Sequence, residues 1–371
     1  MRKHHPENER TKRRYFEFLK HAKGLSETSV DQVAASIADF EAVTGHRDFR
    51  QFRIEWAQKY KRQLAARLNS ETGRPLAKAT ISSRLAGLKA FFQWLAGQSG
   101  FRSKLTYSDA EYFNPSANDD RIAKAARERP IASVEQIRHV LQSMPTENDV
   151  QKRDRALIAF TLLTGARDNA VASMSLRHVD LDKRTVFQDA REMRTKNRKT
   201  FTTWFFPVGA DIETIVGDWI SWLETERQWG PGDPLFPATR VTLAPGGGFA
   251  NGGLDRKHWK SAATIRAIFK QAFGQAGLPY FNPHSFRHTL AILGERICQT
   301  PEAFKAWSQN LGHEHVATTF TSYGAVPGHR QAEIFDQLRT RTVGGETDDA
   351  GEFDNETMLA ILAARLRTKA A

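Results

Sequence analysis

The chain has almost no cysteine and no long apolar segment. Its single cysteine, Cys298, excludes an internal disulfide bond and any cysteine-rich zinc module. No uninterrupted apolar run approaches the ~18 residues that cross a bilayer, and the N-terminal stretch MRKHHPENERTKRRYF lacks the apolar core of a secretory signal. We therefore expect a cytoplasmic protein that has no membrane partner.

Positive charge is what the sequence has in excess. The 371 residues carry a formal net charge of +12, with 40% hydrophobic and 26% charged residues, a balance typical of folded proteins. Residues 1–130 hold 25 Lys and Arg against 15 Asp and Glu, whereas residues 345–371 hold 3 against 6. A basic front and an acidic tail indicate a polyanionic partner such as nucleic acid, although a merely basic surface would give the same counts.

The first hundred residues predict a helical domain. Helical patterns cover residues 11–22, 29–43 and 55–69, and glycines separate them. In residues 78–97 apolar side chains recur at alternating steps of four and three, which predicts a buried stripe. The stripe consists of Ile81, Leu85, Leu88, Phe92 and Leu95. The short hydroxyl and basic side chains predicted to contact DNA phosphates are Lys78, Thr80, Ser82, Ser83, Arg84 and Lys89.

A second domain is predicted after a polar stretch. Residues 114–130 are charged and have no apolar period, which indicates a linker. Ser133 followed by Gln136 is typical of a capped helix start. A strongly apolar helix then ends at Gly165.

These boundaries predict the domain organisation of the whole chain, which suits two domains at roughly 100–200 residues each. We expect a helical front domain over residues 1–113 and a second domain over residues 131–344. An acidic tail over residues 345–371 ends in a short amphipathic helix. Such a helix must dock on its own chain or on a neighbouring protomer to bury its apolar face.

β-Branched and aromatic residues are concentrated in one region. Residues 184–188 and 200–208 predict two strands, with the turn-like TKNRK between them. The glycine-rich stretch 246–253 has neither the spacing nor the strand context of a nucleotide-binding fingerprint, so a flexible loop is expected there. The expected fold class is mainly α with a small antiparallel β-sheet (α+β).

Six side chains of the second domain could carry chemistry together. Taken singly, each has a simpler interpretation, such as a surface arginine, a solvated lysine or a core tyrosine. Together they suit cleavage of a phosphodiester without a metal. Arginine forks bind phosphate oxygens in two places and keep their charge, a lysine can protonate the leaving oxygen, and an activated tyrosine can attack. The six residues are Arg167, Lys196, His284, Arg287, His313 and Tyr323.

The order of these residues resembles that of the tyrosine recombinases, the phage integrase family. The matching motifs are TGAR, RTKNRK, HSFRH, NLGH and TTFTSYG. The resemblance implies a site-specific recombinase that cuts and rejoins double-stranded DNA through a 3′-phosphotyrosyl bond, for integration or excision of a mobile element or related strand exchange. It also implies a front domain of the core-binding (SAM-like) type, no metal or other cofactor, and association with DNA in the bacterial nucleoid.

The resemblance assigns each residue a role. The tyrosine would attack the scissile phosphate, and His284 would accept its proton. Arg167, Arg287 and His313 would bind the non-bridging oxygens. Lys196 would protonate the leaving 5′ oxygen. The resemblance further implies a homotetramer on DNA, assembled through exchange of C-terminal tails.

Two details differ from the family pattern, and in a third the pattern fits either of two lysines. Ala170 stands three residues after the first arginine, where the family commonly has an acidic residue. The step from His313 to Tyr323 is ten residues, one more than expected. In the turn, Lys199 is an alternative to Lys196, which we favour because it lies nearer the tip.

Other functions fit parts of the pattern. A type IB topoisomerase has a similar catalytic set, but the His-x-x-Arg pair, the compact front domain and the tail favour a recombinase. A catalytically inactive DNA-binding accessory protein of the same fold would not need every catalytic residue. A zinc enzyme could use His284, His288, His313 and His315, yet no carboxylate or cysteine stands at a ligand spacing such as H-E-x-x-H.

Overall fold

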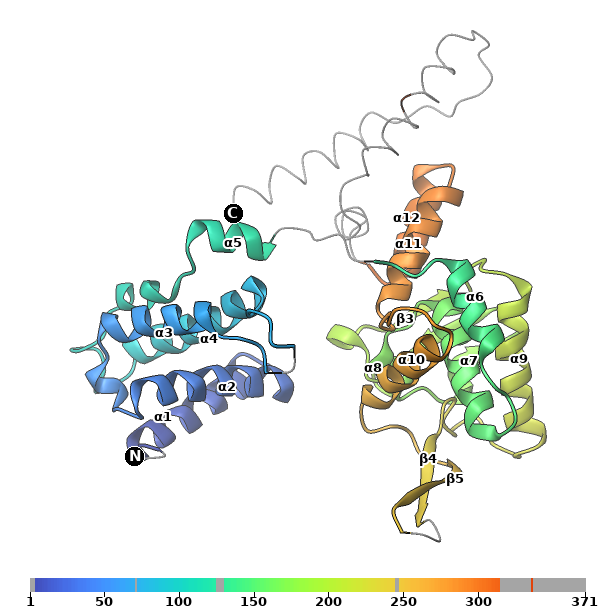
Figure 1. Cartoon of the computed structure of the whole chain (residues 1–371), viewed down its shortest axis with the longest axis horizontal. Coiled ribbons are helices and arrows are strands. Elements are labelled where there is room, and N and C mark those ends of the chain that lie inside the picture. Colours follow the sequence, from blue (N-terminus) through green and yellow to red (C-terminus); the bar gives the residue numbers. More distant parts are fainter. Residues whose placement is uncertain (1–3, 71, 125–129, 244–246, 314–334, 336–371) are drawn as a thin grey trace. The chain divides into compact units, whose positions relative to one another are not determined.

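The chain forms two compact units, Met1–Arg127 and Glu128–Ala371, each with its own hydrophobic core (Figure 1). The computed structural model describes residues 4–70, 72–124, 130–243, 247–313 and 335. None of the helices in these ranges has the length and apolar character that crossing a bilayer requires. The boundary between the units falls within the stretch that the sequence predicts to be a linker.

Helices make up the regular structure of the first unit in its described residues. They are α1 (Pro6–Glu17), which continues as a π-turn (Phe18–Ala22), α2 (Glu27–Thr44), α3 (Ile54–Ala66), α4 (Lys78–Ala96) and α5 (Ala117–Lys124), with 3-10 turns at Phe49–Gln51 and Ser108–Phe113. The predicted apolar stripe of α4 is confirmed, because all five of its side chains are buried. Phe92 at its centre stacks on Phe113 and meets Phe40 edge-on, which locks α4 against the unit's other elements.

Helix α5 lies inside the range expected to be an irregular linker. Its start is set by Ser116, whose hydroxyl accepts a hydrogen bond from the Asp119 backbone. An ion pair of 2.6 Å between Lys78 and Asp119 then joins α5 to the start of α4. The sequence pattern missed this helix because it is held by a partner far along the chain and has little apolar surface of its own.

The second unit is mainly helical and carries all the strands that the structure describes. Its helices are α6 (Val134–Ser143), α7 (Asp149–Thr164), α8 (Asp168–Val171), α9 (Ala210–Thr225), α10 (Ala263–Gln275), α11 (Ser285–Ile297) and α12 (Pro301–Asn310). Its strands are β1 (Val179–Asp180), β2 (Thr185–Gln188), β3 (Phe201–Trp204), β4 (Ala238–Leu243) and β5 (Phe249–Asp255), with 3-10 turns at Leu176–His178 and Lys196–Arg198.

Two predicted helix ends in this unit are confirmed. The Ser133 side chain accepts a hydrogen bond from the Gln136 backbone while the Gln136 side chain accepts one from the Ser133 backbone, so α6 starts with a capping box. Helix α7 ends where Gly165 takes a left-handed conformation with φ 60°. A side chain at Gly165 would also be crowded, since its Cβ would lie 3.0 Å from Leu290 and 3.1 Å from Leu311.

The predicted antiparallel sheet is confirmed as the order β1-β2-β3, in which Val186 pairs with Thr203. The second sheet, the hairpin of β4 and β5, corrects the expectation of a flexible loop over residues 246–253. Gly252 faces Thr242 so closely that a Cβ would lie 2.5 Å from its methyl group. Gly252 therefore fits closely against the partner strand, and its low β-propensity did not predict a strand there.

The packing of α11 against α12 depends on a glycine. A Cβ at Gly294 would lie 2.5 Å from Trp307 Nε1, and this indole is fixed by its hydrogen bond to the Leu290 carbonyl and by contact with Phe206. We expect Gly294→Ala to lower the free energy of unfolding by about 1–3 kcal/mol, because the indole cannot move aside.

Urea unfolding followed by tryptophan fluorescence measures this effect. Gly217→Ala on α9 is the matched control, since nothing lies within 4 Å of its Cβ. We expect that control to stabilise the unit by roughly 0.5–1 kcal/mol, the ordinary gain of alanine over glycine in a helix. Equal stability of the two variants would contradict the packing account.

Candidate active site

Arg287 on α11 joins three parts of the second unit. Its guanidinium donates hydrogen bonds to the carbonyl of Gly165 at 2.6 Å and to the carbonyl of Leu311, and its Nη2 lies 3.2 Å from Nε2 of His313. The residue is only 4% exposed. The end of α7, the end of α12 and His313 are thus held around one buried positive charge.

Arg167 lies just beyond the glycine that ends α7 and is the N-cap residue of α8. Burial lowers the pKa of its guanidinium. No side chain in the described ranges accepts a hydrogen bond from it. Unlike Arg287, this arginine is positioned by its backbone at the helix junction.

The acidic residue that the family commonly has three positions after the first arginine is absent from this chain. Ala170 is buried in α8 at 1% exposure. The acidic residue nearest in sequence, Asp168, instead makes an ion pair of 2.8 Å with Arg266 on α10. That pair anchors the first turn of α8 to α10, which fixes the helix that follows Arg167.

His284 and His313 lie in the field of these cations. His284 precedes α11 and is exposed at the surface, yet neighbouring groups desolvate its imidazole. Desolvation, then the charges of Arg287, His288, Arg167 and Lys196, lower the pKa of His284 to about 4. Desolvation, Arg287 and Arg167 likewise lower the pKa of His313 to about 4. Both imidazoles are therefore neutral at pH 7 and able to accept a proton or a hydrogen bond.

Lys196 begins the 3-10 turn in the connection between β2 and β3, and it is exposed. Its charge contributes to the lowered pKa of His284, which puts the lysine within electrostatic reach of the histidine. Lys199 follows at the end of the turn and is partly exposed. The structure thus brings together the two arginines, Lys196 and the two neutral histidines.

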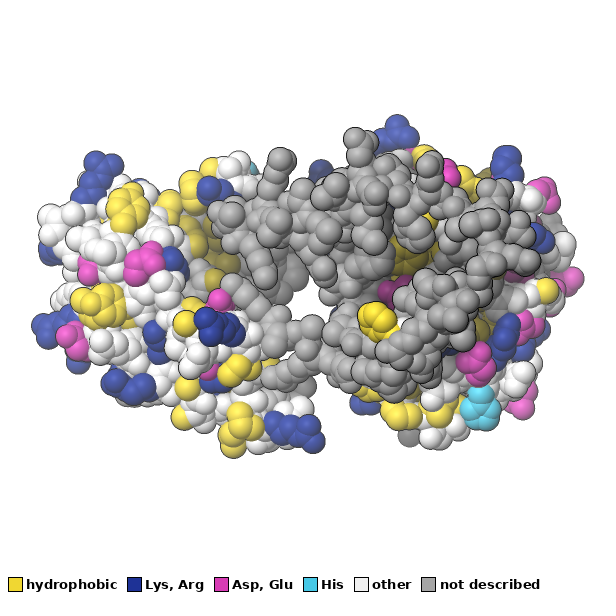
Figure 2. All heavy atoms as spheres, turned by 90° about the horizontal axis from the view of Figure 1, so that it is seen from above, with side chains coloured by type: hydrophobic (Ala, Val, Ile, Leu, Met, Phe, Trp, Pro, Cys, Tyr) yellow, Lys and Arg dark blue, Asp and Glu magenta, His cyan; other side chains and the backbone are white. Residues whose placement is uncertain are grey.

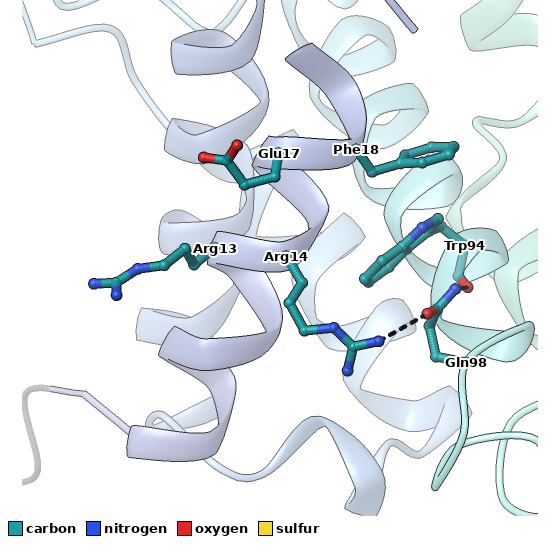
Figure 3. A pocket seen from close by; sticks show the side chains of 6 residues that line it. All are labelled: Arg13, Arg14, Glu17, Phe18, Trp94 and Gln98. Atoms are coloured by element: carbon teal, nitrogen blue, oxygen red, sulfur yellow. Dashed lines mark hydrogen bonds between the residues drawn. The ribbon is translucent and has the colours of Figure 1, made fainter. Parts of the chain in front are cut away.

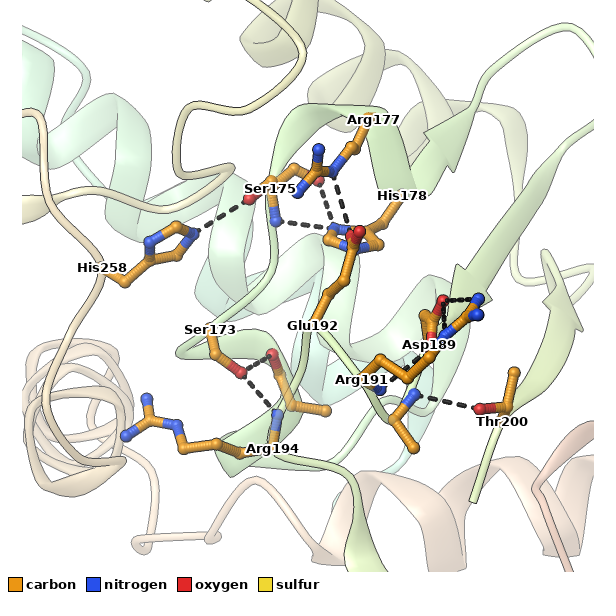
Figure 4. A network of polar contacts seen from close by, with 12 residues as sticks. Ser173, Ser175, Arg177, His178, Asp189, Arg191, Glu192, Arg194, Thr200 and His258 are labelled. Carbon is orange, nitrogen blue, oxygen red and sulfur yellow. Dashed lines mark hydrogen bonds and ion pairs between the residues drawn. The ribbon is translucent and has the colours of Figure 1, made fainter. Parts of the chain in front are cut away.

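A polar network holds the connection that carries Lys196 (Figure 4). Glu192 accepts hydrogen bonds from His178 and pairs with Arg177, each at 3.0 Å. The backbone N–H of Arg194 donates to the hydroxyl of Ser173, which follows α8. Arg194 begins the RTKNRK motif, but the motif gave it no role, and the other residues lie outside the matching motifs. Their contacts join segments 14 or more positions apart.

Several predicted residues lie outside the described residues. They are the predicted nucleophile Tyr323, His315 and the acidic tail. The ten-residue step to Tyr323 and the docking of the last helix therefore stay predictions. Among the side chains that the structure does describe, no three of His, Cys, Asp and Glu gather as a metal site would require.

The predicted DNA-contacting face of α4 is partly occupied by ion pairs within the first unit. Lys78 pairs with Asp119, Arg84 with Asp39 at 2.9 Å, and Lys89 with Glu111 at 2.9 Å. The hydroxyl residues predicted with them, Thr80, Ser82 and Ser83, lie at or near the surface. On the one face that Figure 2 shows, the visible Lys and Arg side chains are scattered and do not merge into one patch.

The first unit also has a surface pocket of about 640 Å³ (Figure 3). It is lined by Arg13, Arg14, Glu17, Phe18, Trp94 and Gln98. Arg14 donates a hydrogen bond to the Gln98 side chain at 3.3 Å across it. None of these six lining residues is a serine, cysteine, tyrosine or lysine that could act as a nucleophile.

Comparison with known proteins agrees with the motif order. The model of the phage integrase family matches residues 132–328. A protein named tyrosine recombinase XerC from Roseiflexus castenholzii is 22% identical over 305 residues, 81% of this chain and 85% of the relative. Another protein of that name, from Ralstonia pickettii, is 23% identical over 340 residues, 88% of this chain and 92% of the relative.

Solved structures show the same fold. A lambda integrase dimer bound to a COC' core site aligns with a TM-score of 0.60 at 12% identity, covering 92% of this chain and 99% of the other. The Tn1549 transposon integrase in complex with transposon right end DNA aligns with a TM-score of 0.53 at 14% identity, covering 89% and 99%.

The two arginines are expected to differ in their effect on stability. Arg287→Lys leaves one buried carbonyl, of Gly165 or Leu311, without its donor, since one ammonium cannot reproduce the guanidinium geometry. We expect a loss of about 1–3 kcal/mol in the free energy of unfolding. Arg167→Lys serves as the matched control and is expected to leave urea unfolding almost unchanged; equal losses in both variants would contradict the different roles.

Acid is expected to destabilise the second unit through its two neutral histidines. The pKa of each is lowered from 6.5 to about 4 in the folded chain. Their contribution to stability is therefore complete above pH 6.5 and is lost as the pH falls from there toward 4, because the unfolded chain binds the protons first.

Melting temperatures at pH 7 and pH 4.5 measure this dependence. We expect the drop between the two pH values to be smaller in the double variant His284→Gln, His313→Gln than in wild type. His139→Gln, which changes an exposed histidine of α6, should keep the wild-type drop. An unchanged drop in the double variant would show that other groups govern the acid response.

Proposed function

Since the chain belongs to the phage integrase family, the tyrosine recombinases, we propose that it is a site-specific DNA recombinase working through a 3′-phosphotyrosyl intermediate. The observation that carries this proposal is the electrostatic cluster of the second unit. Arg167, Arg287 and Lys196 direct positive charge at one place, where His284 and His313 are kept neutral. In the transition state of phosphodiester cleavage, additional negative charge develops on the phosphate oxygens. A site of this kind stabilises that charge.

The chemistry follows from the residue types. The phenol oxygen of Tyr323 attacks the scissile phosphorus and forms a P–O bond, while the bond from phosphorus to the 5′ oxygen breaks. His284, being neutral, accepts the phenol proton. Lys196 donates a proton to the departing 5′ oxygen. In the reverse direction a 5′-hydroxyl attacks the phosphotyrosine and restores the DNA bond, so no external energy source is consumed.

Charge on the non-bridging oxygens is balanced by the two arginines and His313. Arg287 is already bonded to two carbonyls, and its Nη2 lies beside the His313 ring. The phosphate would therefore meet a guanidinium whose orientation is fixed before the DNA arrives. Preorganised donors of this kind cost no rearrangement during the reaction, which makes them effective in catalysis.

We propose that double-stranded DNA is the partner. The DNA would be bound by the second unit and also by the first unit, through α4. The solved relatives support this: one is a lambda integrase dimer bound to a core site, and another is a lambda integrase tetramer bound to a Holliday junction. A homotetramer on DNA, joined by exchange of the C-terminal tails, is the assembly that we propose for this chain. Its biological task would be integration or excision of a mobile element, or a related strand exchange.

Trapping of a covalent adduct tests the nucleophile. Nicked fragments of genomic DNA from the organism that encodes the chain are incubated with the protein in EDTA, and DNA that remains attached in SDS is sequenced. We expect the wild-type protein to enrich one sequence, because the short fragment released at the nick diffuses away and rejoining is prevented. Tyr323→Phe should trap no DNA. Absence of any wild-type adduct would overturn the proposed function.

DNA that carries the enriched sequence then distinguishes a recombinase from a type IB topoisomerase. A recombinase exchanges strands between two DNA molecules that carry the site, whereas a type IB topoisomerase relaxes a single supercoiled circle. We expect exchange products on an agarose gel with wild type. Relaxation without exchange would favour the topoisomerase, and binding without an adduct would favour an inactive accessory protein.

A further inference from the structure

We infer that Arg194 is a positioning residue for Lys196, holding the β2–β3 connection in the arrangement that delivers the general acid. This inference rests on the proposed function, because it concerns the proton donor of that reaction. Arg194 lies two residues before Lys196 in the chain. Its contacts run to two segments outside the connection.

The side chain of Arg194 binds a segment that follows the β4–β5 hairpin. Its Nη2 donates to the carbonyl of Trp259 at 2.6 Å, and its Nη1 donates to the carbonyl of Lys260. Two donors of one planar guanidinium thus engage two successive carbonyls, which fixes both the distance and the direction of the side chain.

The segment that receives Arg194 is itself firmly held. Trp259 is 6% exposed, and the guanidinium of Arg153 lies 5.1 Å from its ring centre. Arg153 is fully buried in α7 and donates hydrogen bonds to the Pro237 carbonyl and the Thr239 hydroxyl, both at 2.9 Å. The anchor of Arg194 is therefore part of the core of the unit.

The backbone of Arg194 makes the second tie, toward α8, the helix that follows Arg167. Its N–H donates to the hydroxyl of Ser173 at 3.0 Å, and that hydroxyl lies 3.1 Å from the Asn169 carbonyl of α8 (Figure 4). One residue thus connects the general-acid segment to α8 and to the core anchor. Lys196 itself is exposed, so its position depends on these ties and not on burial.

A substrate that needs no general acid distinguishes positioning from other roles. In a duplex whose bridging 5′ oxygen is replaced by sulfur, the leaving thiolate is stable without protonation, because thiols have a pKa near ~8.5. The probe is the duplex identified by covalent trapping, made with oxygen or with sulfur. Single-turnover formation of the covalent adduct is measured at saturating protein.

We expect Arg194→Ala to cleave the oxygen duplex ~10- to 100-fold more slowly than wild type, the cost of a misplaced catalytic group. On the sulfur duplex its rate should return to within a few-fold of wild type. Arg191→Ala is the matched control: it removes an arginine of the same connection whose ion pair, with Asp189, stays within that connection. It should react like wild type on both duplexes.

Lys196→Ala separates failure of this inference from failure of the proposed function. If the sulfur duplex rescues Lys196→Ala but not Arg194→Ala, the positioning role is overturned, and Arg194 serves folding or DNA binding instead. If it rescues neither, Lys196 is not the general acid and the proposed mechanism is overturned. A wild-type rate for Arg194→Ala on the oxygen duplex would also overturn the inference.

Ser173→Ala keeps the test decisive should Arg194→Ala fail to fold. It removes the backbone tie and leaves the guanidinium contacts in place. We expect a smaller loss on the oxygen duplex, again restored by sulfur. A loss that sulfur does not restore would overturn the positioning role.

Discussion

The architecture of the second unit depends on one buried guanidinium. Arg287 satisfies the carbonyl that ends α7 and the carbonyl after α12, and it touches His313. A buried charge is costly unless its hydrogen bonds are made, and here backbone carbonyls make them without neutralising the charge. The guanidinium therefore keeps its positive charge inside the fold.

Desolvation, and then the retained positive charge, lower the pKa values of His284 and His313. A carboxylate partner would have raised their pKa values, whereas neighbouring cations lower them. The family position that commonly carries an acid is filled by buried Ala170, and Asp168 is committed to Arg266. Among the described residues the cluster thus consists of cations and neutral imidazoles, which suits a polyanionic substrate.

Local sequence signals predicted the features that depend on short-range physics. The capping box at Ser133, the glycine stop at Gly165 and the buried stripe of α4 each follow from residues within one or two turns of a helix. The order of motifs also named Arg287 and His313, whose side chains lie 3.2 Å apart. The helix α5 and the β4–β5 hairpin were not predicted. An ion pair with the distant Lys78 joins α5 to α4, and the hairpin contains Gly252, a residue of low β-propensity that fits closely against Thr242. Arg194 begins the RTKNRK motif, but no local pattern predicted its contacts, because they reach Ser173 and the carbonyls of Trp259 and Lys260, which are distant in the sequence.

The different ways in which the two arginines are held affect how related sequences should be interpreted. Arg287 serves the fold as well as the proposed chemistry, so a descendant that had lost activity would still need it to keep α7, α11 and α12 together. The side chain of Arg167 makes no comparable hydrogen bonds in the described residues. Random mutation would therefore replace it soon after selection for catalysis ceased. Among relatives of this recombinase, the presence of an arginine at the position of Arg167 is therefore the more informative marker of a working enzyme.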